Sequence, residues 1–202
     1  MYITVLGASG HVGSEITKEL ASRGHQVRAI ARRSSRIPEI KGVERIDGDA
    51  SEAHTLAGLI RGADAVISAL TLDVTGETLL SALKEAGVPR LLVTGGASSL
   101  EIAPGKRLID SPDFPEEWKG FALASHALLE AVRPEKVVDW TYLSPANDFF
   151  EGPRTGKFRL GGDQLLVDSE GKSRISYADY AIAMVDELEQ HLHSRRRFSA
   201  AY

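Results

Sequence analysis

The chain has 202 residues with 43% hydrophobic and 26% charged side chains, values typical of a globular protein, which excludes a disordered or fibrous chain. Its formal charge of −4 gives no general attraction to nucleic acid or anionic lipid, so we expect neither as a partner. The absence of cysteine excludes disulfides, thiolate zinc sites and a cysteine nucleophile. The first residues form an apolar run without a basic leader, and no stretch approaches the ~18 apolar residues of a membrane helix. We therefore expect a cytoplasmic protein.

Short β-branched or aliphatic runs predict strands that alternate with helices along the chain. The strands are expected at residues 2–6, 26–31, 43–47, 64–69, 90–94 and 138–143. Apolar stripes of helical period lie at Val12, Ile16 and Leu20, at Leu79, Leu83 and Ala86, at Phe121, Leu128 and Val132, and at Ala181, Met184, Val185, Leu188 and Leu192. Gly24, Gly62 and Gly87 each follow a helical run, where a left-handed terminal residue is expected. The alternation predicts an α/β fold with a doubly wound parallel sheet, in one domain covering residues 1–202.

Two segments interrupt this pattern, at residues 98–117 and 147–175. The first holds three prolines and is expected to be a long loop. The second holds several glycines and a predicted hairpin of residues 157–160 and 164–168. Because long insertions on a rigid scaffold usually carry substrate contacts, we expect the substrate region there.

The segment from residue 7 to residue 13 is the most informative part of the sequence, because it joins a predicted strand directly to a predicted helix. Gly7 suits a tight turn, Gly10 lets the backbone approach a pyrophosphate, and Gly13 lets the helix pack close to the sheet. The helix N-terminus offers free amides and a positive dipole end to phosphates. This turn predicts a dinucleotide site formed by Gly7, Ser9, Gly10, His11, Val12 and Gly13.

Further motifs follow the later strands: Arg32-Arg33-Ser34, Gly48-Asp49, Ala69-Leu70, Thr94-Gly95-Gly96, Ser144-Pro145 and Asp179-Tyr180-Ala181. Together with the turn they resemble the atypical short-chain dehydrogenase/reductases, in the NmrA-like branch of candidate NADH-flavin reductases that are similar to biliverdin reductase B. The resemblance implies a Rossmann-type NAD(P)-binding fold and an NAD(P)H-dependent oxidoreductase. It also implies further cofactor contacts at Asp49, Ala69, Leu70, Thr94, Gly95, Gly96, Ser144 and Pro145. The biliverdin reductase B group has a histidine in the loop after the sixth strand; residues 144–147 have none, which disfavours a tetrapyrrole substrate.

The second strand ends where such a fold meets the adenosine ribose, and here an acidic residue would favour NAD. The chain has Arg32 and Arg33 instead, whose guanidinium groups suit a 2′-phosphate, with Ser34 as a further donor. We therefore predict that NADP(H) is preferred over NAD(H); the alternative is a solvated basic loop that includes Arg36. Asp49 either faces the adenine or caps the helix that follows Ser51.

A conventional short-chain reductase protonates its substrate with a tyrosine that is followed four residues later by a lysine. No tyrosine of this chain has that lysine, and the helix that should carry the pair has Phe121 and Ser125 at the nearest positions. Hydride transfer to a flavin needs orientation and distance more than an acid. The sequence thus favours reduction of a small-molecule acceptor, either a free flavin (FMN, FAD or riboflavin) or a quinone. A non-catalytic NADP(H) sensor is the alternative; an NAD-dependent epimerase or dehydratase is a second, disfavoured by the missing tyrosine acid.

Several other residues have two possible roles. Ser98 and His126 are the candidate catalytic residues, as a substrate-facing hydroxyl and a proton donor; Ser99 is a second candidate hydroxyl. Trp118, Phe149 and Phe150 would stack on a flavin or pack the loops. The Arg195–Arg197 cluster is expected to complement the end of the last helix, and Ser176 to cap its start. His191 and His193 lack a carboxylate at ligand spacing, so no metal is expected; the oligomeric state stays open.

Overall fold

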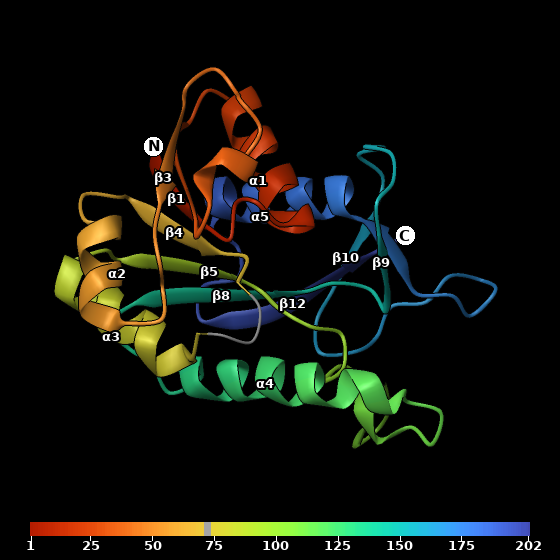
Figure 1. The fold of residues 1–202 in the computed structure, drawn as a ribbon. Helices are drawn as coiled ribbons and strands as arrows, with labels where there is room; N and C mark the ends of the chain where they lie inside the picture. The colour runs from red at the N-terminus through yellow and green to blue at the C-terminus, as the bar shows by residue number, and fades with distance from the viewer. Residues whose placement is uncertain (71–73) are drawn as a thin grey trace.

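The computed structural model describes residues 1–70 and 74–202, which are built around an eight-stranded sheet (Figure 1). In spatial order the strands are β10 (Arg159–Gly161), β12 (Arg196–Ala201), β8 (Asp139–Ser144), β5 (Arg90–Thr94), β4 (Ala65–Ser68), β1 (Tyr2–Leu6), β2 (Gln26–Ala31) and β3 (Val43–Asp47). All of them run parallel except β10, which pairs antiparallel with β12. The predicted doubly wound parallel sheet is confirmed, and its six predicted strands lie within one residue of their expected ends.

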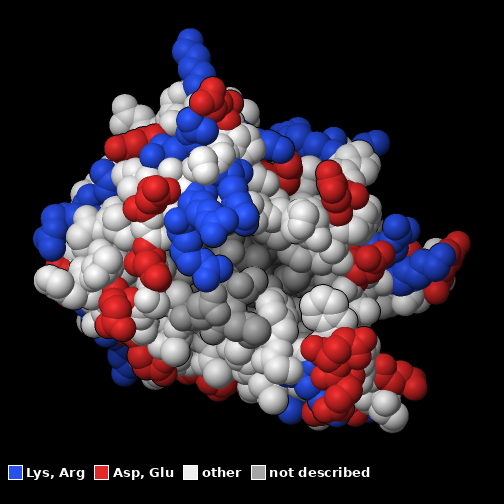
Figure 2. All heavy atoms as spheres, viewed as in Figure 1, with Lys and Arg blue, Asp and Glu red and all other residues white. Residues whose placement is uncertain are grey.

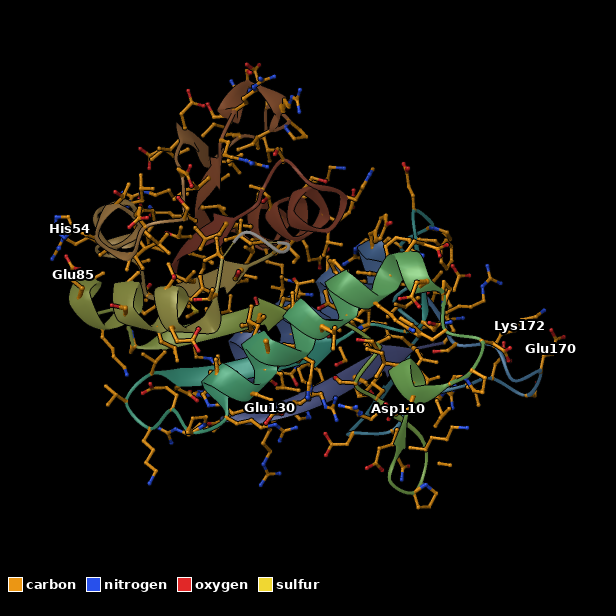
Figure 3. All side chains as sticks on the ribbon, turned by 60° about the horizontal axis from the view of Figure 1, so that its bottom comes forward. His54, Glu85, Asp110, Glu130, Glu170 and Lys172 are labelled. Atoms are coloured by element: carbon orange, nitrogen blue, oxygen red, sulfur yellow. The ribbon has the colours of Figure 1, made fainter. Side chains whose placement is uncertain are left out.

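Helices cover both faces of the sheet (Figure 1). On one face lie α1 (His11–Ser22) and α5 (Tyr177–Gln190); on the other lie α2 (Ala53–Ile60), α3 (Gly76–Ala86) and α4 (Glu116–Val132). A separate apolar core fills each layer, so strand residues alternate between the two cores. Figure 3 shows His54 of α2 pointing toward Glu85 of α3, an ion pair of 2.6 Å on the outside of the second layer.

The helix ends follow the predicted chemistry. Ser176 caps α5 by accepting a hydrogen bond from the Asp179 amide at 3.1 Å, as expected. Gly24, Gly62 and Gly87 have φ of +82°, +82° and +71°, the left-handed conformation predicted for them. None of the described helices is long and apolar enough to cross a membrane.

The largest error of the sequence prediction concerns the C-terminus. Arg195–Arg197 do not serve as cations at the end of the last helix, because α5 has already ended at Gln190 and residues 196–201 form β12. Leu192 is 64% exposed beyond the left-handed His191 instead of belonging to the α5 stripe. Arg197 is almost buried, forms an ion pair with Asp163, and donates to Ser99 at 2.9 Å.

The two irregular segments contain short elements that the sequence did not show. The hairpin predicted at residues 157–160 and 164–168 is wrong, because β10 pairs with β12 instead. The segment at 98–117 is not one loop: it holds the small hairpin of β6 (Glu101–Ala103) and β7 (Lys106–Arg107), and the short helix η2 (Leu108–Asp110), before α4 begins. In the second segment β9 (Asp148–Phe150) pairs with β11 (Arg174–Ser176). A further short helix, η1 (Ser34–Arg36), follows β2.

Candidate functional site

The turn between β1 and α1 is packed so closely that two of its glycines admit no side chain. Gly7 has φ of +77°, and a Cβ on it would lie 2.5 Å from the Ala69 carbonyl oxygen. A Cβ on Gly13 would lie 2.2 Å from the Gly7 carbonyl oxygen. A Cβ on Gly10 would meet only the Gly7 oxygen, at 3.4 Å, so Gly10 faces open space. The turn is therefore tightly packed at Gly7 and Gly13, and it is open beside Gly10, where a ligand would approach.

Helix α1 begins at the open side of this turn. Its N-cap residue, Gly10, supplies no side-chain acceptor, and no acidic residue lies in the first turn. The amides and the positive end of the helix dipole are thus available to an anion. Val12 packs against the core, while the exposed His11 ring stacks on Tyr177 with centroids 5.6 Å apart. Tyr177 begins α5 and was not foreseen as a neighbour of the turn.

A cavity of about 380 Å³, which we call the turn cavity, lies above the turn at the carboxyl ends of the strands. Its wall joins the ends of β1, β2 and β4 to the segment after β3. Seven of the predicted cofactor residues line this cavity: Gly7, Ser9, Gly10, Arg32, Asp49, Ala69 and Leu70. The wall consists of Leu6, Gly7, Ser9, Gly10, Ile30, Ala31, Arg32, Gly48, Asp49, Ala50, Ser51, Ala69, Leu70 and Val74.

A second space of about 410 Å³, the basic hollow, adjoins the turn cavity and shares Ser9 and Arg32 with it. Arg33 and Arg36 complete its lining. Figure 2 shows basic side chains gathered beside a hollow near the middle of this face. Three guanidinium groups around one space give a strongly positive site that suits a phosphate group.

Local hydrogen bonds fix the segments around these spaces. The Ser34 amide donates to Asp47 at 2.6 Å, which lowers the pKa of Asp47 and anchors the start of η1. Asp49 accepts from the Ser51 amide at 2.9 Å, which lowers the pKa of Asp49. Asp49 also lines the turn cavity, whereas α2 begins later, at Ala53 with Glu52 as its N-cap. Asp49 therefore shapes the turn before α2 while its carboxylate stays at the cavity wall.

A third space of about 180 Å³, the inner cavity, continues from the turn cavity and shares Leu70 and Val74 with it. It lies between the ends of β4 and β5 and the helices α3 and α4. Phe121 and Ser125, the two residues at the positions of the conventional Tyr–Lys pair, both face it. The full lining is Leu70, Val74, Thr75, Gly76, Glu77, Thr94, Phe121, Ala124, Ser125, Ala127, Leu128 and Tyr142.

In the predicted motif Thr94-Gly95-Gly96, the two glycines leave room at this cavity for the side chains of Tyr142 and Ser125. A Cβ on Gly95 would lie 2.0 Å from the Tyr142 ring, and a Cβ on Gly96 would lie 2.6 Å from Ser125 Oγ. The Tyr142 hydroxyl lies 2.7 Å from Ser125 Oγ and accepts from the Gly96 amide at 3.1 Å. Burial raises the pKa of Tyr142. Sequence reasoning missed Tyr142 because it searched for a lysine four residues later rather than for a partner on another element.

Ser144 is the last residue of β8, at the same edge of the sheet, and Pro145 follows it; both are buried. Among the described residues, Ser144 Oγ has no hydrogen-bond partner, although the residue is fully buried. Such an unsatisfied hydroxyl is uncommon, and a bound ligand is one way to satisfy it.

Neither candidate catalytic residue lines any of these three spaces. Ser98 is nearly buried, and His126 Nε2 lies 3.4 Å from Arg107. The predicted stacking residues take packing roles: Phe149 contacts Tyr177 and Tyr180 with centroids 4.7 Å and 4.8 Å away. Phe150 packs near Tyr202 and Arg174, whereas Trp118 is 57% exposed beside Phe121.

No group of three or more histidine, aspartate and glutamate residues in the described ranges has the geometry to hold a metal ion. The two late histidines instead contact single carboxylates, His193 with Glu187 at 2.7 Å and His191 with Asp139.

A family model described as NAD(P)H-binding matches residues 7–190, which include the glycine turn, all five α-helices and, except for Leu6, the described lining of the three spaces. The chain belongs to this NAD(P)H-binding family. The structural relatives agree with the NmrA-like branch of the atypical short-chain dehydrogenase/reductases, whose resemblance is confirmed.

Relatives of the NAD(P)H-binding family match over nearly the whole chain. The uncharacterized protein YwnB of Bacillus subtilis is 42% identical, covering 98% of this chain and 97% of its own. Among solved structures, a candidate epimerase from Bacteroides thetaiotaomicron is 42% identical with a TM-score of 0.93, covering 100% and 96% of the two chains. A candidate NADH-flavin reductase from Streptococcus pneumoniae is 38% identical with a TM-score of 0.84, covering 100% and 99%. A candidate exported protein from Burkholderia pseudomallei is 38% identical with a TM-score of 0.90, covering 100% of both.

The residues of the turn cavity fit the dinucleotide that this family binds. The turn is open beside Gly10, the N-cap of α1 supplies no side-chain acceptor to the first amides of the helix, and the unpaired Ser144 hydroxyl lies at the same edge of the sheet outside the cavity lining. The three connected spaces form a path from a cluster of positive charge, across the turn, to a partly apolar cavity. An elongated ligand with an anionic end and a ring-shaped end matches this order.

Proposed function

We propose that this protein is an NADP(H)-preferring oxidoreductase that reduces a small-molecule acceptor, a free flavin or a quinone, in the cytoplasm. The observation that carries the nucleotide preference is the basic hollow, where Arg32, Arg33 and Arg36 surround a space that opens onto the turn cavity. A 2′-phosphate in this hollow receives charge-assisted hydrogen bonds, whereas NADH has only an uncharged 2′-hydroxyl at that position.

A bound reduced nicotinamide nucleotide supplies the hydride in such a reaction. The protein has to hold both partners in line and exclude water, which can lower a barrier by several kcal/mol. Among the described residues that line the inner cavity there is no lysine or histidine, and the phenol of Tyr142 is a weak acid because burial raises its pKa. This lining favours an acceptor whose reduction takes its proton from solvent, as flavins and quinones can. The relative from Streptococcus pneumoniae described as a candidate NADH-flavin reductase supports the same class of acceptor.

The test of the function mixes purified protein with NADPH and one of FMN, FAD, riboflavin or a quinone, and follows the nicotinamide absorbance. Acceptor-dependent loss of absorbance is expected. Tight NADPH binding without turnover for any acceptor would instead identify a non-catalytic sensor, the alternative reading of the NmrA-like branch.

The test of the cofactor preference compares NADPH and NADH binding by calorimetry in the double variant Arg32→Ala/Arg33→Ala. We expect NADPH affinity to fall by at least about 100-fold and NADH affinity to change little, because charged hydrogen bonds contribute about 1.5–3 kcal/mol each. Arg61→Ala, an exposed arginine at the end of α2, is the matched control. Equal losses for both nucleotides in the double variant would refute the preference.

A further inference from the structure

A fourth space lies on the opposite side of the sheet from the carboxyl ends of the strands, and its wall contains four arginines. It has a volume of about 390 Å³ and lies at the amino ends of β8 and β12, beside the end of α4; we call it the arginine hollow. None of its described lining residues belongs to the three spaces of the candidate site. The lining consists of Arg133, Trp140, Asp163, Arg195, Arg196 and Arg197.

Two of these arginines have carboxylate partners. Arg197, whose side chain is only 5% exposed, forms an ion pair of 2.5 Å with Asp163 and also donates to Ser99 Oγ at 2.9 Å. Arg133, at the end of α4, forms an ion pair of 2.8 Å with Glu130 on the exposed surface of the same helix. The hollow therefore has a nearly buried guanidinium group in its wall and a further one at its rim.

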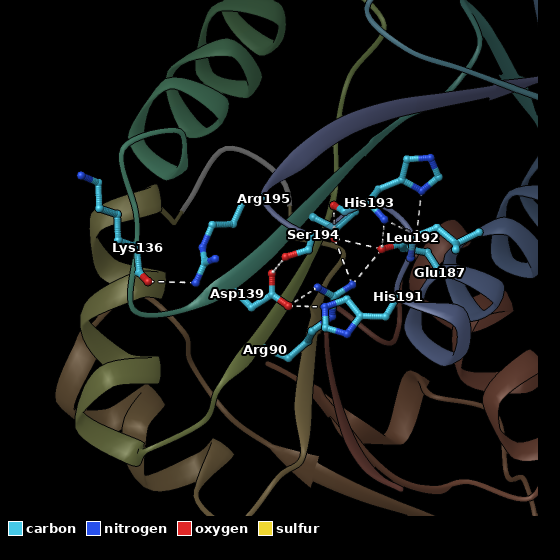
Figure 4. Close-up of polar contacts among 10 residues, drawn as sticks. Arg90, Lys136, Asp139, Glu187, His191, Leu192, His193, Ser194 and Arg195 are labelled. Atoms are coloured by element: carbon cyan, nitrogen blue, oxygen red, sulfur yellow. Dashed lines mark hydrogen bonds and ion pairs between the residues drawn. The ribbon is translucent and has the colours of Figure 1, made fainter.

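The other two arginines have no such partner. Arg195 donates to the carbonyl oxygen of Lys136 at 2.9 Å, in the loop between α4 and β8 (Figure 4). Neither Arg195 nor Arg196 forms an ion pair with a carboxylate in the described part of the chain. Stabilising the negative end of α4 would account for one cation there, but not for four. The arginine hollow thus has an excess of positive charge in a protein whose formal charge is −4.

Trp140 adds a buried hydrogen-bond donor to this wall. The residue is 3% exposed, and its Nε1 has no hydrogen-bond partner among the described residues. Its carbonyl oxygen accepts from the Arg195 amide at 2.7 Å, which holds Arg195 at φ of +51°. A residue with a Cβ adopts this left-handed conformation at a cost, and such residues are concentrated at functional sites. An unsatisfied donor and a strained arginine therefore coincide with the excess of charge.

The charge, size and polarity of the lining indicate the class of ligand. Guanidinium groups bind phosphate oxygens through paired, charge-assisted hydrogen bonds. The volume lies within the roughly 300–1,000 Å³ typical of small-molecule sites, so there is room for more than a phosphate ion. Trp140 is the one apolar side chain among the described lining residues, which favours a polar molecule attached to the phosphate.

We propose that the arginine hollow binds a small, polar phosphate ester, such as a sugar phosphate, whose phosphate group is held by Arg195, Arg196 and Arg197. Asp163 competes with this phosphate for Arg197, because the two are alternative anionic partners of one guanidinium group. The site lies apart from the turn cavity and the basic hollow, so the inference goes beyond the proposed function and does not depend on it.

The test measures binding of ribose 5-phosphate, inorganic phosphate and succinate by calorimetry at constant ionic strength. Because the basic hollow also suits a phosphate group, all titrations use the full chain with Arg32→Ala/Arg33→Ala as background. We expect ribose 5-phosphate to bind about threefold more tightly than inorganic phosphate, and succinate to bind more weakly than both. Tighter binding of inorganic phosphate would overturn the ester and assign the hollow to the free ion, and tighter binding of succinate would overturn the phosphate assignment.

Removing the two unpaired arginines should weaken this binding. In Arg195→Ala/Arg196→Ala we expect ribose 5-phosphate affinity to fall by at least about tenfold, because two charged donors are lost. Lys41→Ala/Arg61→Ala is the matched control, since it removes the same charge from exposed positions outside the hollow. Equal losses in the two double variants would show that only the overall charge matters and would overturn the site.

Asp163→Asn separates ligand binding from structural support. We expect ribose 5-phosphate affinity to rise by about threefold, because Arg197 loses its competing carboxylate while Ser99 still accepts from it. If the arginines only support the fold, Asp163→Asn changes the stability and leaves the affinity unchanged, which would overturn the inference.

Trp140 reports where the ligand binds. The chain has two tryptophans, so Trp118→Phe leaves Trp140 as the one indole that fluoresces. We expect ribose 5-phosphate to change the Trp140 emission with the same half-saturation as the calorimetric titration. Heat of binding without any change in this emission would place the ligand elsewhere and overturn the site. A protein that binds no nicotinamide nucleotide would refute the proposed function and leave each of these outcomes measurable.

Discussion

The two edges of the sheet use the same kinds of side chain in opposite ways. At the amino ends of β5 and β8, Arg90 is enclosed by carboxylates, lying 2.7 Å from Asp139 and 2.9 Å from Glu187 (Figure 4). His191 and His193 bond the same two carboxylates. At the carboxyl ends, Arg32, Arg33 and Arg36 line the basic hollow, the charge of Arg32 acts on Asp49, and the Ser144 hydroxyl has no partner among the described residues.

The difference lies in where the carboxylates are placed. A buried arginine is tolerated only when opposite charges and hydrogen bonds replace its water, and the amino edge supplies both to the two terminal nitrogens of Arg90, whereas Arg90 Nε has no partner among the described residues. The carboxyl edge has amides at a helix start, guanidinium groups and hydroxyls, and its carboxylates Asp47 and Asp49 accept hydrogen bonds from the backbone amides of Ser34 and Ser51. An anionic ligand can complete that edge, as expected for the ligand side of an open parallel sheet. The Arg90 network therefore holds the fold together, and the carboxyl edge is prepared for binding.

Gly13→Ala should break the binding edge most severely. Its Cβ would lie 2.2 Å from the Gly7 carbonyl oxygen, a backbone atom, so the turn or α1 has to shift. We expect NADPH affinity to fall by about 1,000-fold, because the amides that face the pyrophosphate move with the turn. Calorimetry measures the loss. Gly58→Ala in α2 is the control: its Cβ meets nothing within 4 Å, and it should raise stability by about 0.5–1 kcal/mol. Unchanged affinity in Gly13→Ala would refute the pyrophosphate site.

Arg90→Met should break the other edge and leave binding alone. The substitution leaves Asp139 and Glu187 facing each other without their shared cation, which costs about 3–5 kcal/mol of unfolding free energy. Denaturant unfolding measures the loss, and NADPH affinity of the folded variant should match the wild type. A large loss of affinity with little loss of stability would show that the two edges are not independent.

The sequence could predict those features of the two edges that depend on residues close together in the chain. The glycine turn, the arginines after β2 and the Ser176 cap are short patterns whose chemistry depends on neighbours in the chain. β12 was missed because its buried residues are Phe198, Ser199, Ala200 and Ala201, only one of which is large and apolar. It is a strand because it lies between β8 and β10, which is a tertiary cause.

The inner cavity was hidden for a related reason. Ser125 and Tyr142 are 17 residues apart and meet only when α4 packs over β8. The alternation of Trp140 and Tyr142 along one strand indicates that both face the same layer, and this signal could have placed Tyr142 beside α4. The amino-edge network was equally hidden, because Arg90, Asp139 and Glu187 come from three distant parts of the chain.

Glu135→Gln should produce a smaller, pH-dependent loss of stability. Burial alone would raise the pKa of Glu135, but Lys84 at 2.6 Å and the amides of Val137 and Val138 lower it to about 2. A depressed pKa means that the carboxylate stabilises the fold above its unfolded value near 4.5 and loses this contribution as the pH falls toward 2. We expect a loss of about 1–3 kcal/mol at pH 7 that shrinks between pH 4.5 and 2. Exposed Glu130→Gln is the control for unfolding titrations; a constant difference would contradict the assignment.

His126→Asn should have the smallest effect, although His126 is the residue type best suited to donate a proton near neutral pH. Its ring is beside Arg107, which in turn binds Asp110 at 3.0 Å, and it contributes nothing to the lining of the inner cavity. We expect kcat and KM with NADPH and quinone to stay within about twofold of the wild type, with the same pH profile; His54→Asn on α2 is the control. A kcat lowered more than tenfold together with a lost limb of the pH profile would place proton donation on the Arg107 side of α4, and the solvent route proposed for the acceptor would then be wrong.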